Sequence, residues 1–461
     1  MVFTVETIRE NNFLRFRSRS MVGNNYSINY FLDTFKKITE EYKSKCQDIL
    51  KSTLRATLLK NSGKNMTSFK DDTIKANKVI VGKDNLICEN ENINLDDIQV
   101  NEGEEQDNEN YEILDESKLG LVGLNNIGAT CYMNATLQCF SNISFLRHEL
   151  LNKDLLNNLQ SQKDTKKLSY ALAEVLYNLW EIHGQKSYSP ENFKNLIGSM
   201  NSLFSGIAAN DPKDLILFIL ETMHNELKMI DDDISVDENF VPNQHDLSQV
   251  YKDFENCYLS KNKSFIFDIF FGCQNIITSC LNCNTSLYNV QVNNIIFFPL
   301  EEIRKYKNKN YDTPVIIQDC FEYTQKYETY NSYYCNVCYN NNSQAISFTK
   351  YLYAPRVLII NLNRGKGVQF NVKFDFDDNY LNIKQYVTLE ESPFKYELIG
   401  VICHFGESGM GGHFIAFCKR KLNDKIKKWY KFNDGIVYEV EFNEVRTNGM
   451  PYVLFYSCIN E

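Results

Sequence analysis

The sequence predicts an α+β fold in which helices come first and a mainly antiparallel sheet follows. Two observations carry this prediction. Between residues 132 and 229, apolar residues recur at steps of three and four positions, which is typical of helices with one buried face. From residue 287 onward, short runs rich in β-branched and aromatic residues are separated by Gly, Asn and Pro, which is typical of strands.

The elements follow in that order along the chain. Helices are expected over residues 132–151, 168–182 and 213–229, and Asp211-Pro212 supplies an N-cap and a first-turn proline for the last of them. Strands are expected over these ranges: Leu287–Pro299, Ala345–Asn361, Tyr396–His404, His413–Lys419 and Tyr452–Cys458.

Two further regions precede this part of the chain. Residues 1–83 hold 16 Lys/Arg and 8 Asp/Glu, which is a charge of +8, and residues 28–58 show helical periodicity. That amphipathic helix either packs on its own protein, or forms a coiled coil or docks on a protein partner. Residues 84–117 hold 13 acids and no base, so residues 84–118 are expected to form a disordered acidic linker. The third region, residues 119–461, has no comparable break and is expected to form the large folded domain.

Composition narrows the class of protein. The net charge is −10, and the first two regions account for +8 − 13 = −5, so the large domain carries −5 and is not the basic domain of a nucleic-acid binder. No apolar run approaches the ~18 residues of a membrane span. Fourteen cysteines without an apolar secretion signal indicate thiols or metal ligands rather than disulfides. We therefore expect a cytoplasmic or nuclear protein with neither a nucleic-acid nor a membrane partner.

Cys131 has the surroundings of a nucleophile. It follows a loop that ends near Gly128, and Met133, Leu137 and Phe140 then have helical spacing. A cysteine at a helix N-terminus is favoured as thiolate by the helix dipole. By chemistry alone, a buried structural cysteine is an equally good interpretation.

The residues around Cys131 resemble the cysteine box of the ubiquitin-specific proteases. The matching residues are Gly123, Leu124, Asn126, Gly128, Thr130, Cys131, Tyr132, Met133, Asn134, Leu137 and Gln138, and Ile127 replaces the usual Leu. The resemblance implies that Cys131 is the nucleophile and that the side-chain amide of Asn126 stabilises the oxyanion. For Asn126 the alternative is a residue that only shapes the turn.

His413 is the candidate general base among six histidines. It follows Gly411 and Gly412 at the start of an alternating strand. The region resembles the histidine box of the same family, whose later part matches in Trp429, Tyr430, Phe432, Asn433, Asp434 and Val437. The resemblance implies that His413 is the base and that His404, which also matches, is a sheet residue.

Asn433 is predicted to orient the imidazole of His413, with Asp434 assisting. We expect the amide oxygen to accept the Nδ1–H, which would leave Nε2 facing the sulfur. Both side chains reach the site only if residues 433–435 form a turn, and Gly435 favours one. The alternative for Asp434 is a turn residue that caps its own backbone.

Two CxxC pairs predict a structural zinc site. Cys280 and Cys283 form one pair, and Cys335 and Cys338 form the other, so four thiolates can complete a tetrahedral site for one zinc ion. The resemblance places such pairs in an inserted fingers subdomain, here about residues 265–360. The alternative is four free cysteines.

The resemblance implies a papain-like fold with a helical thumb, a sheet-bearing palm and zinc-bearing fingers. It implies a deubiquitinating thiol protease, a ubiquitinyl hydrolase, whose partners are ubiquitin and ubiquitinated proteins. Two alternatives remain: a ubiquitin-binding pseudoenzyme, and a protease for a ubiquitin-like modifier. The chain departs from the family in one stretch, where Ala209-Asn210-Asp211 stands in place of the usual Gln-Gln-Asp.

Overall fold

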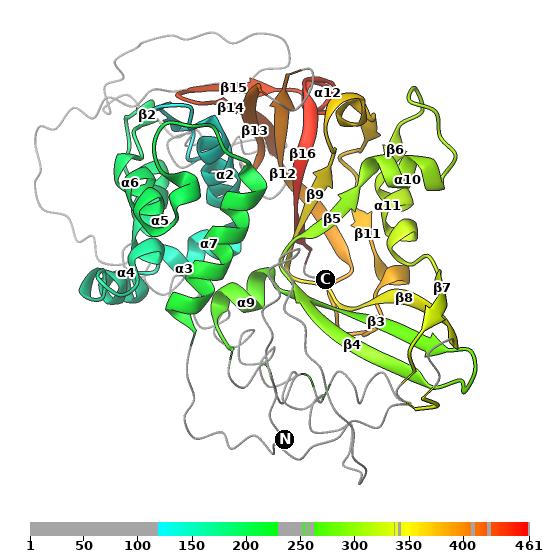
Figure 1. The fold of residues 1–461 in the computed structure, drawn as a ribbon. Coiled ribbons are helices and arrows are strands. Elements are labelled where there is room, and N and C mark those ends of the chain that lie inside the picture. The colour runs from blue at the N-terminus through cyan, green and yellow to red at the C-terminus, as the bar shows by residue number, and fades with distance from the viewer. Residues whose placement is uncertain are drawn as a thin grey trace, which may run out of the picture. The chain divides into compact units, whose positions relative to one another are not determined.

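This computed structural model describes residues 119–228, 252, 254, 258, 262–335, 337–339, 343–406, 411–421 and 426–459. The predicted basic extension with its helix (1–83) and the predicted acidic linker (84–118) lie outside the described residues. The described part confirms the α+β prediction, with helices first and sheets after them (Figure 1).

The thumb is a group of helices at the left of Figure 1. Its helices are α2 (Cys131–Asn142), α3 (Ser144–Leu150), α4 (Lys153–Ser161), α5 (Lys167–Trp180), α6 (Glu191–Met200) and α7 (Pro212–Leu227), followed by the short α9 (Phe265–Phe270). The prediction of one helix over 132–151 was wrong, because Ile143 adopts an extended backbone (φ −76°, ψ 105°) and separates α2 from α3. Ile143 is fully buried there, so the break turns its side chain into the core.

Asp211 caps α7 as predicted. Its side chain accepts a 2.8 Å hydrogen bond from the backbone N–H of Lys213, and Pro212 occupies the first turn. Proline costs no hydrogen bond at this position, since first-turn N–H groups have no partner within the helix.

The palm is an eight-stranded sheet. Its order is β15 (Ile436–Val440), β14 (Lys427–Asn433), β13 (His413–Lys421), β12 (Lys395–Phe405), β16 (Met450–Cys458), β9 (Val357–Asn363) and β5 (Ile296–Pro299), and β11 (Leu381–Asn382) also pairs with β12. The sheet is not wholly antiparallel, because β5 pairs parallel to β9 at one edge. Parallel pairing requires a long crossover, and the intervening residues 300–356 supply it.

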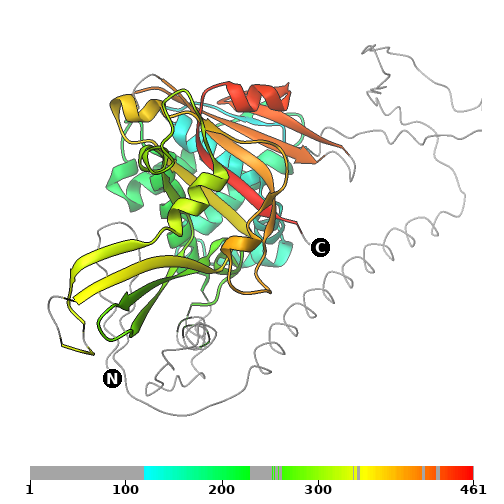
Figure 2. The ribbon, with the colours of Figure 1, turned by 90° about the vertical axis from the view of Figure 1, so that its right-hand side faces the viewer.

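The fingers are a four-stranded antiparallel sheet that projects away from the palm (Figure 2). Its order is β4 (Ser286–Asn293), β3 (Gly272–Cys280), β8 (Ser343–Tyr353) and β7 (Glu328–Tyr333). Two runs predicted as single strands, 287–299 and 345–361, each divide into a fingers strand and a palm strand. The second run divides at Pro355, which has no N–H to donate to a sheet ladder.

Smaller elements complete the fold. They are β1 (Gly123–Leu124) parallel to β2 (Ser187–Tyr188), β6 (Val315–Ile316) parallel to β10 (Phe374–Asp375), helices α10 (Leu300–Tyr306), α11 (Ile317–Thr324) and α12 (Phe442–Thr447), and the 3₁₀ turns Ser202–Phe204, Gly367–Asn371 and Lys384–Tyr386. No helix among the described residues is long and apolar enough to cross a membrane.

The palm sheet is covered on both faces. One core joins the thumb helices to inward side chains such as Ile402, Ala416 and Phe455. The other joins Val401, Phe417 and Leu454 to α10, α11 and the loops beside them. Successive strand residues supply opposite cores, as the two-residue period of a strand requires. The first of these cores packs α2 against β12, β13 and β14.

Candidate active site

Cys131 is the first residue of α2, as predicted, and is 5% exposed. The turn before it is unusual, because Gly128 (φ 117°) and Ala129 (φ 48°) both have positive φ. A non-glycine residue in this region costs of order 1–2 kcal/mol, which the surrounding contacts must offset. Because Cys131 is the first residue of α2, its sulfur lies at the helix N-terminus, where unpaired N–H groups and the helix dipole favour negative charge.

Strand pairing brings His413 and Asn433 together. His413 begins β13 and Asn433 ends β14, so these antiparallel neighbours place both residues at the same end of the palm sheet. The register pairs Ala416 with Phe432. Continued by one residue, this register sets Asn433 opposite Ile415. His413 lies two residues before Ile415 and therefore on the same face of β13.

The imidazole uses its nitrogens in the opposite way to the prediction. Nε2 of His413 lies 2.7 Å from Oδ1 of Asn433, so Nε2 carries the proton donated to the amide oxygen and Nδ1 remains for the sulfur. The predicted assignment of Nδ1 to Asn433 was therefore wrong. Nε2 is the ring nitrogen farther from the backbone and reaches across to the end of β14, whereas α2 packs directly on β13.

The environment of His413 favours the imidazolium. The hydrogen bond to Cys131 is the largest cause, and with Asn433 and Asp434 it outweighs partial burial and raises the pKa of His413 to about 9 from an ordinary 6.5. A ring that keeps its proton at neutral pH beside a thiol is the arrangement of a thiolate–imidazolium pair.

Asp434 lies in the hairpin turn that Gly435 was expected to favour, between β14 and β15. Its backbone is left-handed (φ 50°). Its Oδ2 is 3.9 Å from Nε2 of His413 and accepts a 3.0 Å hydrogen bond from Nδ2 of Asn126. The direct partner of the ring is thus Asn433, and Asp434 is hydrogen-bonded to the predicted oxyanion donor.

Both ends of the Asn126 amide are held. Its Oδ1 accepts from the backbone N–H of Thr130 (3.1 Å) and Gly128 (3.3 Å) and from the Thr130 hydroxyl (3.3 Å), while Nδ2 donates one hydrogen to Asp434. The second hydrogen of Nδ2 is then fixed in direction. The structure thus brings Cys131, His413, Asn433, Asp434 and Asn126 to one place.

A close backbone approach joins the turn at 434–435 to β1. A Cβ on Gly123 would lie 2.4 Å from the carbonyl group of Gly435, so only glycine fits there. The neighbouring Leu124 donates its N–H to the carbonyl oxygen of Asp434 at 2.9 Å. The strand that leads to Asn126 therefore rests directly on the turn that carries Asp434.

Sequence reasoning assigned no role to Asn134 and Gln138, although both belong to the matching motif. All 12 residues of α2 are buried, yet Asn134, Gln138 and Asn142 recur every four positions and form a polar stripe. Amide side chains on a fully buried helix require hydrogen-bond partners. That spacing was the available signal that this helix is fixed by polar contacts.

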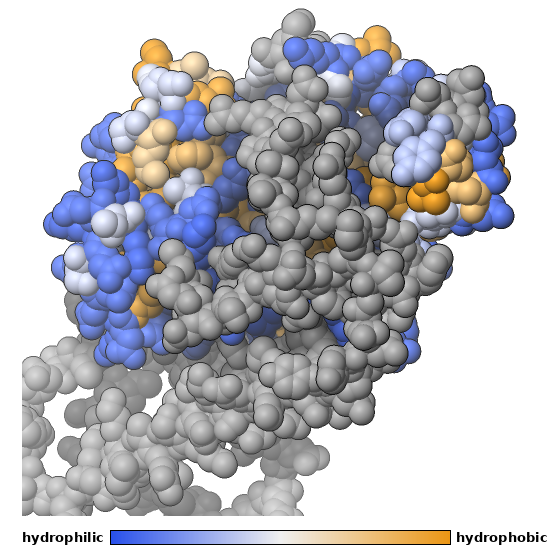
Figure 3. All heavy atoms as spheres, turned by 60° about the horizontal axis from the view of Figure 1, so that its bottom comes forward, coloured by the Kyte–Doolittle hydropathy of each residue, from blue (hydrophilic) through white to orange (hydrophobic). Residues whose placement is uncertain are grey.

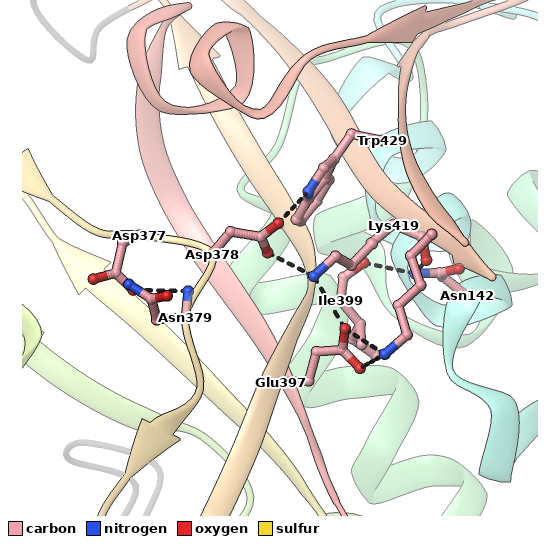
Figure 4. Close-up of polar contacts among 9 residues, drawn as sticks. Asn142, Asp377, Asp378, Asn379, Glu397, Ile399, Lys419 and Trp429 are labelled. Carbon is pink, nitrogen blue, oxygen red and sulfur yellow. Dashed lines mark hydrogen bonds and ion pairs between the residues drawn. The ribbon is translucent and has the colours of Figure 1, made fainter. Parts of the chain in front are cut away.

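The C-terminal end of α2 is attached to the palm through Asn142 (Figure 4). Its Nδ2 donates to the carbonyl oxygens of Ile399 (2.6 Å) in β12 and Lys419 (3.2 Å) in β13. The strand that carries His413 is therefore hydrogen-bonded to the helix that carries Cys131.

The far end of the β13–β14 hairpin is held by a charged cluster (Figure 4). The ammonium group of Lys419 contacts Asp378 (2.7 Å) and Glu397 (3.0 Å), and the Trp429 indole donates to Asp378 (3.2 Å). Lys427 binds Glu397 at 2.6 Å. Because Lys419 is only 10% exposed, these contacts are partly shielded from water and fix the hairpin that presents His413 and Asn433.

His404 has a packing role. It is 4% exposed in β12, with ring contacts to Phe370 and Phe414. A Cβ on Gly412 would lie 2.5 Å from its Nε2, so the glycine before His413 makes room for the His404 ring. The expectation that His404 is a sheet residue agrees with this position.

The four CxxC cysteines meet at the tip of the fingers. Their sulfurs all lie within 4.8 Å of one another, with 3.6 Å between Cys283 and Cys335 and 4.0 Å between Cys280 and Cys338. Tetrahedral ligands at a Zn–S distance of about 2.3 Å would be about 3.8 Å apart. The cluster fits a metal ion, and the 11 cysteines of the described residues are all free thiols.

The two CxxC turns have the same conformation. Asn284 and Tyr339, each the residue after the second cysteine, have positive φ and donate their N–H at 2.9 Å to the carbonyl of the first cysteine in their pair. Backbone N–H groups inside each turn also point at the first sulfur, that of Cys280 or Cys335. Such hydrogen bonds stabilise thiolate ligands.

Comparison with known proteins identifies the same family as the sequence motifs. Residues 122–456 match the family model described as UCH, ubiquitin carboxyl-terminal hydrolase. Among curated relatives, ubiquitin carboxyl-terminal hydrolase 2 of Bos taurus is 26% identical over 353 residues, which is 74% of this chain and 55% of that protein. Ubiquitin carboxyl-terminal hydrolase 4 of Saccharomyces cerevisiae (strain ATCC 204508 / S288c) is 28% identical over 381 residues, which is 73% of this chain and 39% of that protein. The chain thus spans about half or less of the length of these relatives.

Solved structures show the same fold. The SAGA Ubp8/Sgf11/Sus1/Sgf73 DUB module bound to ubiquitin aldehyde matches with a TM-score of 0.55 and 23% identity, over 75% of this chain and 71% of that chain. Another structure of the yeast module matches with a TM-score of 0.54 and 22% identity, over 75% of this chain and 70% of that one.

Proposed function

Because the chain belongs to the ubiquitin carboxyl-terminal hydrolase family, we propose that it is a deubiquitinating cysteine protease. It hydrolyses the peptide or isopeptide bond after the C-terminal glycine of ubiquitin through a thioester. The observation that carries this proposal is the convergence of Cys131 at the start of α2, His413 with Asn433 at 2.7 Å from its far ring nitrogen, and Asn126 held by Asp434.

The first step forms the tetrahedral intermediate that precedes the thioester. Nδ1 of His413 holds the proton of the thiol, and the sulfur of Cys131 attacks the carbonyl carbon of the terminal glycine. The C–S bond forms as the π electrons of the carbonyl move to its oxygen. The negative oxygen then lies near the N–H groups that begin α2 and the free hydrogen on Nδ2 of Asn126.

The second step releases the leaving group. The oxyanion collapses, the C–N bond breaks, and Nδ1 of His413 gives its proton to the departing amine. The neutral ring next removes a proton from water, whose oxygen attacks the thioester carbonyl. The second tetrahedral intermediate collapses as the C–S bond breaks, so ubiquitin leaves with a free carboxylate, and the sulfur and imidazole again share their starting proton. Asn433 holds Nε2–H throughout, so the ring does not rotate between the two steps.

Acidic side chains suit the arginines of the ubiquitin tail, Leu-Arg-Leu-Arg-Gly-Gly. Asp211 lies where α7 of the thumb meets β16 of the palm, and its carboxylate is 27% exposed. Asp214 lies one turn further along α7 and is 37% exposed. Each carboxylate also lies near the ammonium group of Lys213, at 3.6 and 3.5 Å, so the arginines would compete with Lys213 for this charge. The glutamines usual in this stretch are missing.

We propose zinc as the metal of the four-cysteine cluster, with one ion held by Cys280, Cys283, Cys335 and Cys338. Four thiolates leave no open position, so the ion is structural. It joins the β3–β4 turn to the segment between β7 and β8, and its binding energy contributes to folding.

The tip of the fingers also offers an apolar contact surface, at the right of Figure 3. Exposed side chains there include Leu281 (46%), Val337 (56%) and Tyr339 (77%). Exposed apolar groups of this kind are typical of protein-binding surfaces. We propose that they contact the folded body of ubiquitin while its tail reaches Cys131.

Two further proposals rest on the sequence. The helix that the sequence predicts within residues 28–58 is a docking element for a protein partner, because its periodic apolar residues would form one continuous face for a partner to cover. The protein acts in the cytoplasm, the nucleus or both, since a thiol nucleophile needs a reducing compartment.

The direct test is turnover of ubiquitin that carries a fluorogenic amide at its C-terminus. Wild-type protein should release the fluorophore, and Cys131→Ser should reduce kcat by at least about 10³-fold while it still binds ubiquitin. Wild-type protein that binds ubiquitin but releases no fluorophore would contradict the proposed activity.

A further inference from the structure

Asn134 lies one helical turn after Cys131 and is 2% exposed. Its Nδ2 donates at 2.8 Å to Oδ1 of Asp434 and at 3.0 Å to the carbonyl oxygen of Leu124, with the carbonyl of Asn125 at 3.3 Å. An amide nitrogen has two hydrogens. One of them is used on a carboxylate 300 positions away in the chain, and the other is used on the strand that leads to Asn126.

The orientation of this amide carries a cost. Its other end, Oδ1, is buried and has no hydrogen-bond partner. Rotating the amide by 180° would direct Oδ1 at the carboxylate of Asp434, where two acceptors would repel each other. An orphaned buried acceptor calls for an explanation, and the donor that it sets against Asp434 supplies one.

The consequence is that both oxygens of Asp434 are held by amides. Oδ1 accepts from Asn134, and Oδ2 accepts from Asn126 at 3.0 Å. A carboxylate restrained at both oxygens does not rotate about its Cβ–Cγ bond. It therefore fixes the direction of Nδ2 of Asn126, and with it the hydrogen that faces the reacting carbonyl.

We propose that Asn134 is a positioning residue for oxyanion stabilisation, acting through Asp434 on Asn126. This inference rests on the proposed function, because an oxyanion develops only during acyl transfer. Asn134 is buried, and its side-chain hydrogen bonds go to Asp434 and to the segment before Asn126 rather than to the thiol or the imidazole. Its removal should therefore affect the transition state more than the binding of ubiquitin.

The same helix offers a matched control. Gln138, one turn further, is 1% exposed and donates from Nε2 at 2.8 Å to the carbonyl oxygen of Val122, the residue before β1. It therefore resembles Asn134 in burial, in donor type, in a buried amide oxygen without a partner and in holding the segment that leads to Asn126. It differs in having no hydrogen bond to Asp434.

The test is a double-mutant cycle on the full chain with the fluorogenic ubiquitin substrate. Asn134→Ala should lower kcat roughly 10- to 100-fold with KM nearly unchanged. In an Asp434→Ala background, the same change should lower kcat by less than about 3-fold, since its target is gone. Gln138→Ala should have the same effect in both backgrounds. An Asn134→Ala effect of equal size in both backgrounds would overturn the proposal.

A binding comparison separates positioning from folding. Ubiquitin aldehyde adds to the thiol to form a tetrahedral adduct, whereas ubiquitin itself forms none. Asn134→Ala should weaken inhibition by the aldehyde by about the factor lost in kcat and leave the affinity for ubiquitin within about 3-fold. Equal loss of both affinities would mean that Asn134 only supports the fold.

Should Asn134→Ala fail to fold, the isosteric Asn134→Asp keeps the proposal testable. The introduced carboxyl faces Asp434, so the two groups share a proton at low pH and repel each other once both are ionised. The kcat of this variant relative to wild type should rise as pH falls from 8 to 6, and a constant ratio would contradict the proposal.

If wild-type protein does not turn over ubiquitin at all, both the proposed function and the role of Asn134 fail. An active wild type with an additive cycle refutes only the latter.

Discussion

Nε2 of His413 lies 2.7 Å from Oδ1 of Asn433, and Oδ2 of Asp434 lies 3.9 Å from the same nitrogen. The amide is therefore the direct partner of the ring, although the carboxylate carries the charge. The two side chains divide the work: Asn433 orients the imidazole, and Asp434 holds Asn126.

The first prediction follows from this division. Asn433→Ala removes the acceptor of Nε2–H, so the ring loses its orientation and kcat/KM on a ubiquitin substrate should fall roughly 10- to 10³-fold. Cys131→Ala and His413→Ala should abolish nearly all activity. Near-wild-type activity of Asn433→Ala beside a crippled Asp434→Ala would transfer the orienting role to Asp434.

The second prediction concerns pH. The raised pKa of His413, about 9 against an ordinary 6.5, means that the protonated ring is favoured in the folded protein. The stability that it contributes is complete below 6.5 and is lost as pH rises through about 9. Activity that depends on the protonated ring should decline over the same alkaline range.

An NMR titration of the His413 ring measures this directly. Because the hydrogen bond to Cys131 is the largest cause of the raised pKa, the pKa of His413 should fall toward 6.5 in Cys131→Ala. An unchanged high pKa in that variant would mean that the thiol is not its cause.

The third prediction concerns the metal. Purified protein should contain about one zinc ion per chain, and Cys280→Ala or Cys335→Ala should lose the ion together with much of the stability. Cys320→Ala is the control, because Cys320 is fully buried in the core that packs α10 and α11 on the palm sheet but lies outside the four-cysteine cluster. It should lower stability and keep the zinc. Metal-free protein of undiminished stability would rule out a structural metal.

The fourth prediction concerns the first 118 residues. Both described cores are built from residues 121–458. A protein that begins at Lys118 should therefore fold and keep most of its activity on a small ubiquitin substrate. A truncated protein with an intact melting transition but no turnover would show that the basic extension completes the catalytic domain.

Much of this fold was readable from local patterns. Apolar periodicity located α5 and α7, and Asp211-Pro212 marked the N-cap and first turn of α7, which begins one residue before the predicted range. The parallel pairing of β5 with β9 was not predictable, because an apolar run identifies a strand without naming its neighbour. The break at Ile143 was hidden for a similar reason, since burial of its side chain depends on a core formed by distant residues.

The candidate site was also only partly predictable from the sequence. Cys131, His413 and Asn433 belong to motifs whose residue types and spacing carry the chemistry, so their proximity was expected. The choice between Nδ1 and Nε2 was not, because it depends on which side of β13 faces α2 and how far β14 extends. Asn134 and Asp434 are 300 positions apart in the chain. The only sequence signal of their contact was the recurrence of polar residues at every fourth position of α2.

The most direct test of the central claim is labelling by ubiquitin with an electrophile at its C-terminus, followed by identification of the modified residue by mass spectrometry. Matching probes built on ubiquitin-like modifiers are the specificity control. The account predicts one adduct on Cys131 with the ubiquitin probe, faster than with any other probe and absent in His413→Ala at neutral pH. Folded protein that is not labelled, or that is labelled only by a ubiquitin-like probe, would contradict it.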